Sequence, residues 1–385
     1  MTGPDRKVNA VHQFRVEVSQ SALNDLKNRL VETRWPADVT GAGWGYGVPQ
    51  EYLKNFVEYW INEYSWRKHE ARLNEFSQFM TTIDGANVHF INVRSPEATA
   101  KPLVLIHGWP GSIAEFFELI GPLSDPRRHG GDPADAFHVI VPSIPGYGFS
   151  GPAPDCGWSY KRVAAAFAGL MERLGYDRYA VHGGDLGAII GREMGMADQP
   201  RIIGVHVLQA FTFPSGEPGE TDGLSQEDCR RVARLADFQQ RKGAYAMLQS
   251  TRPQTLAYAL NDSPVGQLAW NLDFMANCGD TADALSRDQV LTNVMMYWLT
   301  ETSGSSAALY LENAQAGLWG EQQPSTFPMG VAVFPDDFLS IRHLAERNNH
   351  NIVRWTEFDR GGHFAAMEVP ALLIEDIRGF FRGLS

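Results

Sequence analysis

Residues 181–187 of the chain read Val181-His182-Gly183-Gly184-Asp185-Leu186-Gly187. The apolar run 179–181 leads into this stretch and Ala188-Ile189-Ile190 follows it, so the pattern predicts a turn between a strand and a helix. The Gly-x-Asp-x-Gly spacing is typical of a nucleophile elbow that carries aspartate where an esterase carries serine. Glycine is needed on both sides of Asp185 because such a turn is tight, and a larger side chain would clash with the sheet or the helix. Taken alone, the stretch also fits a glycine-rich turn with an aspartate that caps the helix.

The segments around this turn alternate between strand-like and helix-like patterns. Continuous apolar runs predict buried strands at 103–106, 139–141, 179–181, 330–334 and 352–355. Helical patterns occur at 113–123 and 163–174, and a last helix is predicted at 370–382. This alternation predicts an α/β fold, with a mostly parallel central sheet that is flanked by helices.

Two long segments do not follow the alternation. The first is predicted to be a helical arm, because Leu23, Leu26 and Leu30 recur at helical spacing and a strand pattern begins only at Ala86. The second is rich in Leu, Ala and aromatic residues and predicts a helical lid inserted into the sheet. We therefore expect an arm at 1–95 that packs on the core and the lid, a core at 96–210 and 326–385, and a lid at 211–325.

The chain order of nucleophile, acid and histidine is that of the α/β-hydrolase fold, and Asp185, Asp337 and His363 follow it. Each of them stands just past the carboxyl end of a predicted strand, where open α/β sheets bind their ligands. The loop 107–111, His-Gly-Trp-Pro-Gly, follows another strand. One backbone N–H from this loop and that of Leu186 are predicted to form an oxyanion hole, whereas the side chain of His107 is expected to organise the loop.

These motifs resemble the epoxide hydrolases of the microsomal and juvenile-hormone type, and in particular their soluble bacterial members. The resemblance extends over nearly the whole chain, through the motifs Arg34-Trp35-Pro36, His107-Gly108-Trp109-Pro110-Gly111-Ser112, Gly183-Gly184-Asp185, Leu260-Asn261-Asp262-Ser263-Pro264-Val265-Gly266, Phe334-Pro335-Asp336-Asp337 and Gly361-Gly362-His363-Phe364-Ala365-Ala366. Two features depart from the family. The hydrophobic anchor of the membrane-bound relatives is not seen, so a soluble protein is expected. The acid, often glutamate in those relatives, is Asp337 with Asp336 beside it, which leaves open which carboxylate orients the histidine.

The resemblance implies an aspartate nucleophile and two lid tyrosines, which fall by motif on Tyr245 and Tyr310. Attack of Asp185 on an epoxide carbon would give an alkyl ester, while the tyrosine hydroxyls donate hydrogen bonds to the epoxide oxygen. The expected product is a vicinal diol, and no cofactor is needed. The aromatic-rich lid suggests an apolar pocket and therefore a hydrophobic epoxide as substrate.

The second half of the implied reaction uses the histidine. His363, oriented by Asp337, would remove a proton from the water that attacks the ester. The backbone N–H groups of Trp109 and Leu186 would hold the oxyanion formed in that step.

Three alternatives remain open at this point. A haloalkane dehalogenase also has an aspartate elbow, but it needs a halide donor such as tryptophan after the nucleophile, where this chain has Leu186. A serine esterase is disfavoured because no Gly-x-Ser-x-Gly motif follows a buried strand. In the stretch 146–150, Gly-Tyr-Gly-Phe-Ser, the serine is Ser150 at the end and not at the centre. The third alternative is a binding protein that has the hydrolase fold and no catalytic activity.

Composition narrows the class of partners and the compartment. With 33 basic against 45 acidic residues the net charge is -12, which disfavours nucleic acid as a partner. Cys156, Cys229 and Cys278 fit neither a metal site nor a disulfide framework, as expected for a reducing cytoplasm. We find no membrane-span pattern and no nucleotide-binding or metal-ligand motif, so we expect a cytoplasmic protein without membrane contact, cofactor or metal. Its partners would be a small-molecule epoxide, water and, as is common among enzymes, a second copy in a homodimer.

Overall fold

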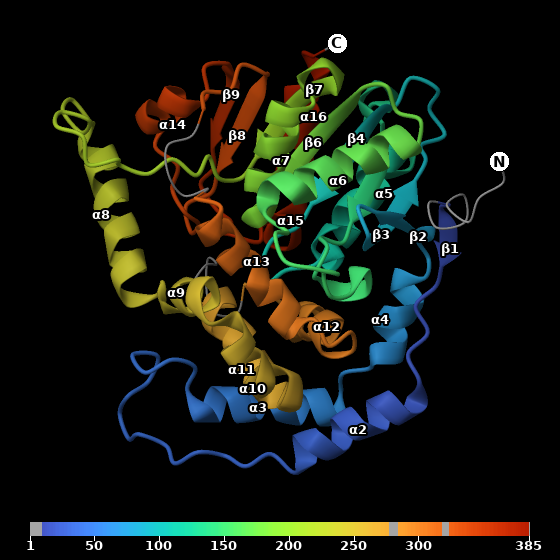
Figure 1. The fold of residues 1–385 in the computed structure, drawn as a ribbon, viewed down its shortest axis with the longest axis vertical. Helices are drawn as coiled ribbons and strands as arrows, with labels where there is room; N and C mark the ends of the chain where they lie inside the picture. Colours follow the sequence, from blue (N-terminus) through green and yellow to red (C-terminus); the bar gives the residue numbers. More distant parts are fainter. Residues whose placement is uncertain (1–9, 277–283, 318–322, 385) are drawn as a thin grey trace.

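A nine-stranded sheet forms the centre of the computed structural model, which describes residues 10–276, 284–317 and 323–384 (Figure 1). The strands are β1 (His12–Phe14), β2 (Gln78–Ile83), β3 (Ala86–Val93), β4 (Lys101–Ile106), β5 (Phe137–Pro142), β6 (Tyr179–Gly183), β7 (Ile202–Val207), β8 (Met329–Val333) and β9 (Ile352–Glu357). Their spatial order is β1-β2-β3-β5-β4-β6-β7-β8-β9. Neighbours from β5 to β9 pair in parallel, and β1 to β3 add antiparallel to β5. The predicted fold class, a mostly parallel α/β sheet, is therefore confirmed.

Helices cover both faces of the sheet (Figure 1). One face carries α6 (Tyr160–Arg173) and α7 (Leu186–Ala197), and the other carries α5 (Phe117–Ser124) and α16 (Pro370–Arg382). Adjacent residues of β7 show the two sides, since Val205 lies against Gly191 of α7 whereas Gly204 lies against Phe380 of α16. Two short helices, α14 (Arg342–Asn348) and α15 (Ala365–Glu368), flank β9 in the chain.

Three strands differ from what the sequence predicts. Residues 12–14 and 78–83 lie in a region with a helical pattern, yet they form β1 and β2 at the edge of the sheet. The buried positions of β2 are Gln78 and Thr81, both polar and on opposite faces, so the strand lacks the apolar alternation that predicts a strand. In β7 the apolar run is interrupted by Gly204 and His206, which hid that strand as well.

The remaining helices form a layer beside the sheet. From the N-terminal region come α2 (Gln20–Val31), α3 (Gln50–Asn62) and α4 (Trp66–Leu73). From the predicted lid range come α8 (Gln226–Arg241), α9 (Ala244–Thr251), α10 (Pro253–Asp262), α11 (Pro264–Met275), α12 (Arg287–Trp298) and α13 (Ser303–Gln315). In Figure 1, α2 and α3 lie below this second group. The two groups are joined by polar contacts: the Tyr59 hydroxyl donates to Asp288 Oδ1 at 2.8 Å, and Arg29 Nη1 donates to the Asp262 carbonyl at 2.8 Å.

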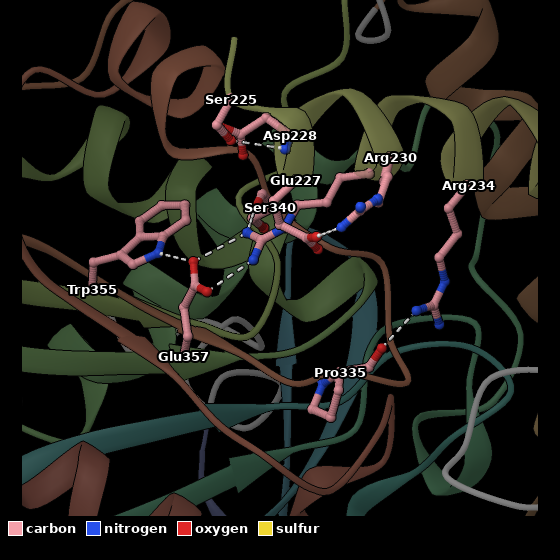
Figure 2. Close-up of polar contacts among 10 residues, drawn as sticks. Ser225, Glu227, Asp228, Arg230, Arg234, Pro335, Ser340, Trp355 and Glu357 are labelled. Carbon is pink, nitrogen blue, oxygen red and sulfur yellow. Dashed lines mark hydrogen bonds and ion pairs between the residues drawn. The ribbon is translucent and has the colours of Figure 1, made fainter.

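Helix α8 is attached to the core by arginine side chains. Arg231 donates to both carboxylate oxygens of Glu357, at 3.1 and 2.8 Å, and to the Ser340 carbonyl at 3.0 Å. Arg234 donates to the Pro335 carbonyl at 2.7 Å, and Figure 2 shows it reaching that backbone from α8. These contacts fix α8 beside the loop that follows β8 and carries Asp337.

Candidate active site

Asp185 occupies a strained turn between β6 and α7. Its backbone has φ 52° and ψ -127°, a conformation that residues with a Cβ rarely adopt. A Cβ on Gly183 would lie 2.2 Å from the Gly187 carbonyl oxygen, and one on Gly187 would lie 2.0 Å from the Ile106 carbonyl oxygen. The glycine spacing that predicts the elbow is therefore explained by backbone contacts that leave no room for a side chain.

The carboxylate of Asp185 is buried and receives backbone hydrogen bonds. The Trp109 N–H donates to Asp185 Oδ1 at 2.9 Å, and the Leu186 N–H also donates to this carboxylate. Gln209, just past β7, accepts from the Asp185 N–H at 2.6 Å. The two backbone donors that the sequence predicts for an oxyanion hole thus both face the carboxyl group of residue 185.

His363 lies between two aspartates. Its Nε2 is 3.6 Å from Asp185 Oδ2, and its Nδ1 is 2.6 Å from Asp337 Oδ1. Asp337 is held in turn by the Phe338 N–H at 2.7 Å and by the Gln209 side chain. Of the two adjacent aspartates that the sequence left open, Asp337 is the one that contacts His363.

The two lid tyrosines lie against the loop that follows β4. Tyr245, on α9, stacks on Trp109 with 5.1 Å between ring centroids and 10° between planes. Tyr310, on α13, meets both rings edge to face, at 6.1 Å from Trp109 and 6.1 Å from Tyr245. Phe274 extends this aromatic cluster to His363, whose ring is 5.0 Å away. The cluster therefore brings both tyrosines to the residues that surround Asp185.

Comparison with known proteins gives the family. Residues 11–116 match the family described as "Epoxide hydrolase N terminus", and residues 101–273 match "alpha/beta hydrolase fold". A protein of Stigmatella aurantiaca named "Putative epoxide hydrolase" is 45% identical over 96% of this chain and 84% of its own length. "Epoxide hydrolase 1" of Sus scrofa is 35% identical over 96% of this chain and 88% of its own length. The chain belongs to the epoxide hydrolases.

The fold of this epoxide hydrolase agrees with that assignment. The juvenile hormone epoxide hydrolase of the silkworm Bombyx mori superposes with a TM-score of 0.88 at 28% identity, over 99% of this chain and 96% of that one. The resemblance inferred from the motifs and the predicted α/β-hydrolase fold are confirmed. The chain is therefore an enzyme that hydrolyses the ether bond of an epoxide, so that a small-molecule epoxide and water are its substrates.

Burial and charge set the protonation of the site. Burial raises the pKa of the Asp185 carboxyl above its usual value, although the charge of His363 and the two backbone N–H groups oppose that shift. Burial by itself would lower the pKa of His363, but the charge and hydrogen bond of Asp337, with further help from Asp185, raise it to about 9. At neutral pH we therefore expect an ionised Asp185 beside a protonated His363 in the resting epoxide hydrolase.

We expect the acid limb of the pH profile to lie above the ordinary aspartate range. The predicted attack of Asp185 on an epoxide needs the ionised carboxylate, and its raised pKa means that protonation begins at a higher pH than in a free aspartate. The measurement is kcat/KM against pH on an acid-stable epoxide, with circular dichroism at each pH as the control for folding. An acid limb at or below about pH 4 would contradict the buried environment assigned to Asp185.

Replacing each of the two adjacent aspartates tests which one serves His363. Asp337→Asn is expected to lower kcat by about 10²- to 10⁴-fold, because the Nδ1 contact at 2.6 Å loses its charged acceptor. Asp336→Asn is the matched control, with less than about a threefold change expected, since Asp337 and not Asp336 accepts at His363 Nδ1. Equal losses in the two variants would contradict the assignment.

Two residues of the site escaped the sequence analysis. Gln209 joins the backbone of Asp185 to the carboxylate of Asp337, and no signal marked it because the strand before it, β7, was not predicted either. Glu115 lies near Asp185 and His363, and burial raises its pKa to about 8. Its sequence context, a helix-like stretch after the loop 107–111, did not distinguish it from a surface glutamate.

Other residues of the initial analysis have ordinary structural contacts. His107 bonds through Nε2 to the Ile144 N–H and through Nδ1 to the Gly108 carbonyl, as expected of a residue that organises its loop. The Ser150 hydroxyl donates to the Ser143 carbonyl at 2.7 Å and accepts from a backbone N–H, so it is bound into the β3–β5 region. Cys156 and Cys229 are free and exposed, and Cys278 lies outside the described residues.

Metal and membrane features were also sought in the described ranges. Within 10–276, 284–317 and 323–384, no group of three or more His, Cys, Asp or Glu residues is arranged to hold a metal ion. None of the helices described there is both long enough and apolar enough to cross a bilayer.

Proposed function

We propose that this epoxide hydrolase opens a hydrophobic epoxide to a vicinal diol through a covalent alkyl ester on Asp185. The observation that carries the proposal is the position of the Asp185 carboxylate. One oxygen accepts from the Trp109 N–H, while the other lies 3.6 Å from His363 Nε2. A carboxylate held in this way has one oxygen stabilised as a future carbonyl and one oxygen available for attack.

In the first half-reaction, Asp185 Oδ2 attacks an epoxide carbon and the ring C–O bond breaks. The electron pair of that bond moves to the epoxide oxygen, which takes a proton from Tyr245 or Tyr310. Burial raises the pKa of Tyr310 well above its usual value, so its hydroxyl remains a donor at neutral pH. The aromatic cluster around Trp109 would exclude bulk water from this step and favour an apolar substrate.

In the second half-reaction, water attacks the carboxyl carbon of Asp185. Ester formation removes the Asp185 charge, which is one of the interactions that raise the pKa of His363, so His363 then gives up its proton, which restores the tyrosine that ring opening deprotonated. Neutral His363 accepts a proton from the water, Asp337 stabilises the imidazolium, and the oxyanion forms at the N–H groups of Trp109 and Leu186. The bond from the carboxyl carbon to the alkyl oxygen then breaks, and that oxygen takes the proton from the His363 imidazolium as the diol leaves. The regenerated carboxyl group of Asp185 gives its proton to His363, which restores the resting state.

A single turnover in heavy-oxygen water tests this sequence of steps. With enzyme in excess, the first diol should carry an unlabelled oxygen from Asp185, and the peptide that contains this residue should gain the label. Mass spectrometry of the peptide and of the diol measures both. A diol labelled in the first turnover, with an unlabelled peptide, would show direct attack by water and would overturn the proposal.

The lid tyrosines should act on ring opening alone. Tyr245→Phe and Tyr310→Phe are each expected to slow alkylation by about 10- to 100-fold, and the double variant by about 10³-fold or more, because the developing alkoxide loses its donors. Stopped-flow quenching of tryptophan fluorescence measures this step, since Trp109 stacks on Tyr245. Tyr258→Phe, on an exposed tyrosine of α10, is the control. Unchanged alkylation in the double variant would exclude the tyrosines as proton donors.

A further inference from the structure

A small cavity lies beneath the nucleophile, on the side of the sheet that faces α5 and α16. It is lined by the four polar residues Asp185, His363, Glu115 and His182, among apolar neighbours that include Phe116 and Leu208. The cavity leaves about 10 Å³ for the centre of a water molecule. That is about the space that a single water needs, and a buried water also needs two to four polar partners. The cavity therefore has the size and the chemistry of a site for one water molecule.

His182, one of the residues that line this cavity, has a buried polar atom without a partner in the described part of the chain. It lies on β6, three residues before the nucleophile, and its side chain is fully buried. Its Nδ1 is 2.9 Å from Nδ1 of His206, the residue opposite it on β7. Its Nε2 is buried and has no hydrogen-bond partner among the described residues. A buried polar atom without a hydrogen-bond partner destabilises the folded protein, so a partner such as a water molecule is expected at this position.

A chain of hydrogen bonds sets the proton position on His182. Asp376, on α16, contacts His206 Nε2 at 2.9 Å and is itself paired with Arg354 at 2.6 Å. A carboxylate only accepts hydrogen bonds, so His206 Nε2 carries a proton. Because Arg354 already balances the charge of Asp376, a second proton on the buried His206 would leave an uncompensated cation. His206 Nδ1 is therefore an acceptor, and His182 Nδ1 must be the donor.

The same reasoning gives the protonation state of Nε2, the other ring nitrogen of His182. With its proton on Nδ1, a neutral His182 has a free lone pair on Nε2. Burial holds the pKa of His182 well below its usual value, which agrees with a neutral ring. The relay from Asp376 through His206 thus presents a hydrogen-bond acceptor at the cavity.

We propose that His182 is a positioning residue that holds the hydrolytic water through Nε2, with its acceptor state maintained by His206 and Asp376. The inference rests on the proposed ester mechanism, because it concerns the water that cleaves that ester. The water donates one hydrogen to His182 Nε2 and the other to neutral His363, and one lone pair of its oxygen is directed at the carboxyl carbon of Asp185. Both residues line the cavity together with Asp185, so the geometry serves the second half-reaction and leaves ring opening unaffected.

Glu115 completes the set of partners. Its Oε1 is buried and has no hydrogen-bond partner among the described residues. Burial raises its pKa to about 8, so the carboxyl group is mainly protonated at neutral pH and can donate to the second lone pair of the water. A neutral Glu115 also adds no repulsive charge beside Asp185 during alkylation.

The first test is the protonation of His182 in the unmodified enzyme. Long-range ¹H–¹⁵N spectra of the ¹⁵N-histidine protein, assigned by comparison with His182→Gln, report which ring nitrogen carries the proton. We expect Nδ1 to be protonated and Nε2 to have the shift of an unprotonated imidazole nitrogen. A protonated Nε2 would overturn the proposal, and this result does not depend on the reaction mechanism.

The second test separates the two half-reactions in variants. His182→Leu, which removes the acceptor, is expected to slow decay of the Asp185 ester by about 10- to 100-fold while alkylation stays within about twofold, since misplacing a reactant by about 1 Å can cost about 10²-fold. His182→Gln, whose amide oxygen can accept from the water, should recover most of the decay rate. Rapid-quench mass spectrometry of the protein measures formation and decay of the ester.

The matched control is His89→Leu, another fully buried histidine of the sheet, whose ring nitrogens both bond to side chains outside the site. It should lower the melting temperature and leave the ratio of the two rates unchanged. Ester decay that is unaltered in His182→Leu, or an equal slowing of both steps there, would overturn the role of His182. If the wild-type enzyme forms no ester at all, the proposed function fails instead, so the two failures are distinguishable.

Discussion

Asp185→Asn is expected to lower kcat/KM by about 10⁴-fold or more, the largest loss of any single substitution in this enzyme. The carboxamide keeps the size of the side chain and its acceptor oxygen for the Trp109 N–H, but it is a poor nucleophile and carries no charge to pair with His363. Asparagine also tolerates positive φ better than other residues, so the turn at φ 52° should persist. Initial rates on a hydrophobic epoxide measure the effect, and intact mass confirms that residue 185 remains an amide.

Asp84→Asn is the matched control for that variant. Asp84 is also an aspartate at positive φ, 50°, but its side chain is exposed and paired with Arg162 away from the site. Full activity is expected there, which separates a chemical effect at the nucleophile from a general effect of asparagine in this backbone conformation. More than about 1% of wild-type activity in Asp185→Asn would argue that another group attacks the epoxide.

His363→Gln is expected to divide the reaction in two. Alkylation of Asp185 should proceed, because the carboxylate and the lid tyrosines are intact. Hydrolysis should stop, because no base is available to take a proton from water, and turnover should fall by about 10³-fold or more. Intact mass spectrometry is then expected to show one equivalent of epoxide bound per chain, in a species that persists for many wild-type turnover times.

A histidine outside the site provides the comparison for His363→Gln. His343, exposed on α14, should tolerate the same substitution with wild-type turnover and no accumulated adduct. The outcome that contradicts the mechanism is an adduct on His363→Gln that decays as fast as in the wild type. The absence of any adduct, with the variant folded, would place His363 in the first half-reaction instead.

The features that could be predicted from the sequence are those with local causes. The elbow was found because glycine spacing around Asp185 reflects clashes with the backbone of Gly187 and Ile106, and these contacts recur wherever such a turn follows a strand. The parallel strands other than β7 were found because a strand covered on both faces is apolar along its whole length, as the residues 103–106 are. By contrast, β2 buries Gln78 and Thr81, whose polar side chains find partners only in the folded protein, so its pattern predicted no strand.

By itself, the sequence determined the fold class, the family, and a set of candidate residues at the carboxyl ends of the strands. Side-chain periodicity and turn sterics are properties of neighbouring residues, and the order of motifs along the chain is read directly from the sequence. Only the tertiary structure decided that Asp337 rather than Asp336 contacts His363, that Gln209 links two of the aspartates, and that His182 and Glu115 face one cavity. Those outcomes depend on distances between residues far apart in the chain and on burial, which alters acidity and hydrogen bonding only after the sheet, the lid and the arm have packed together.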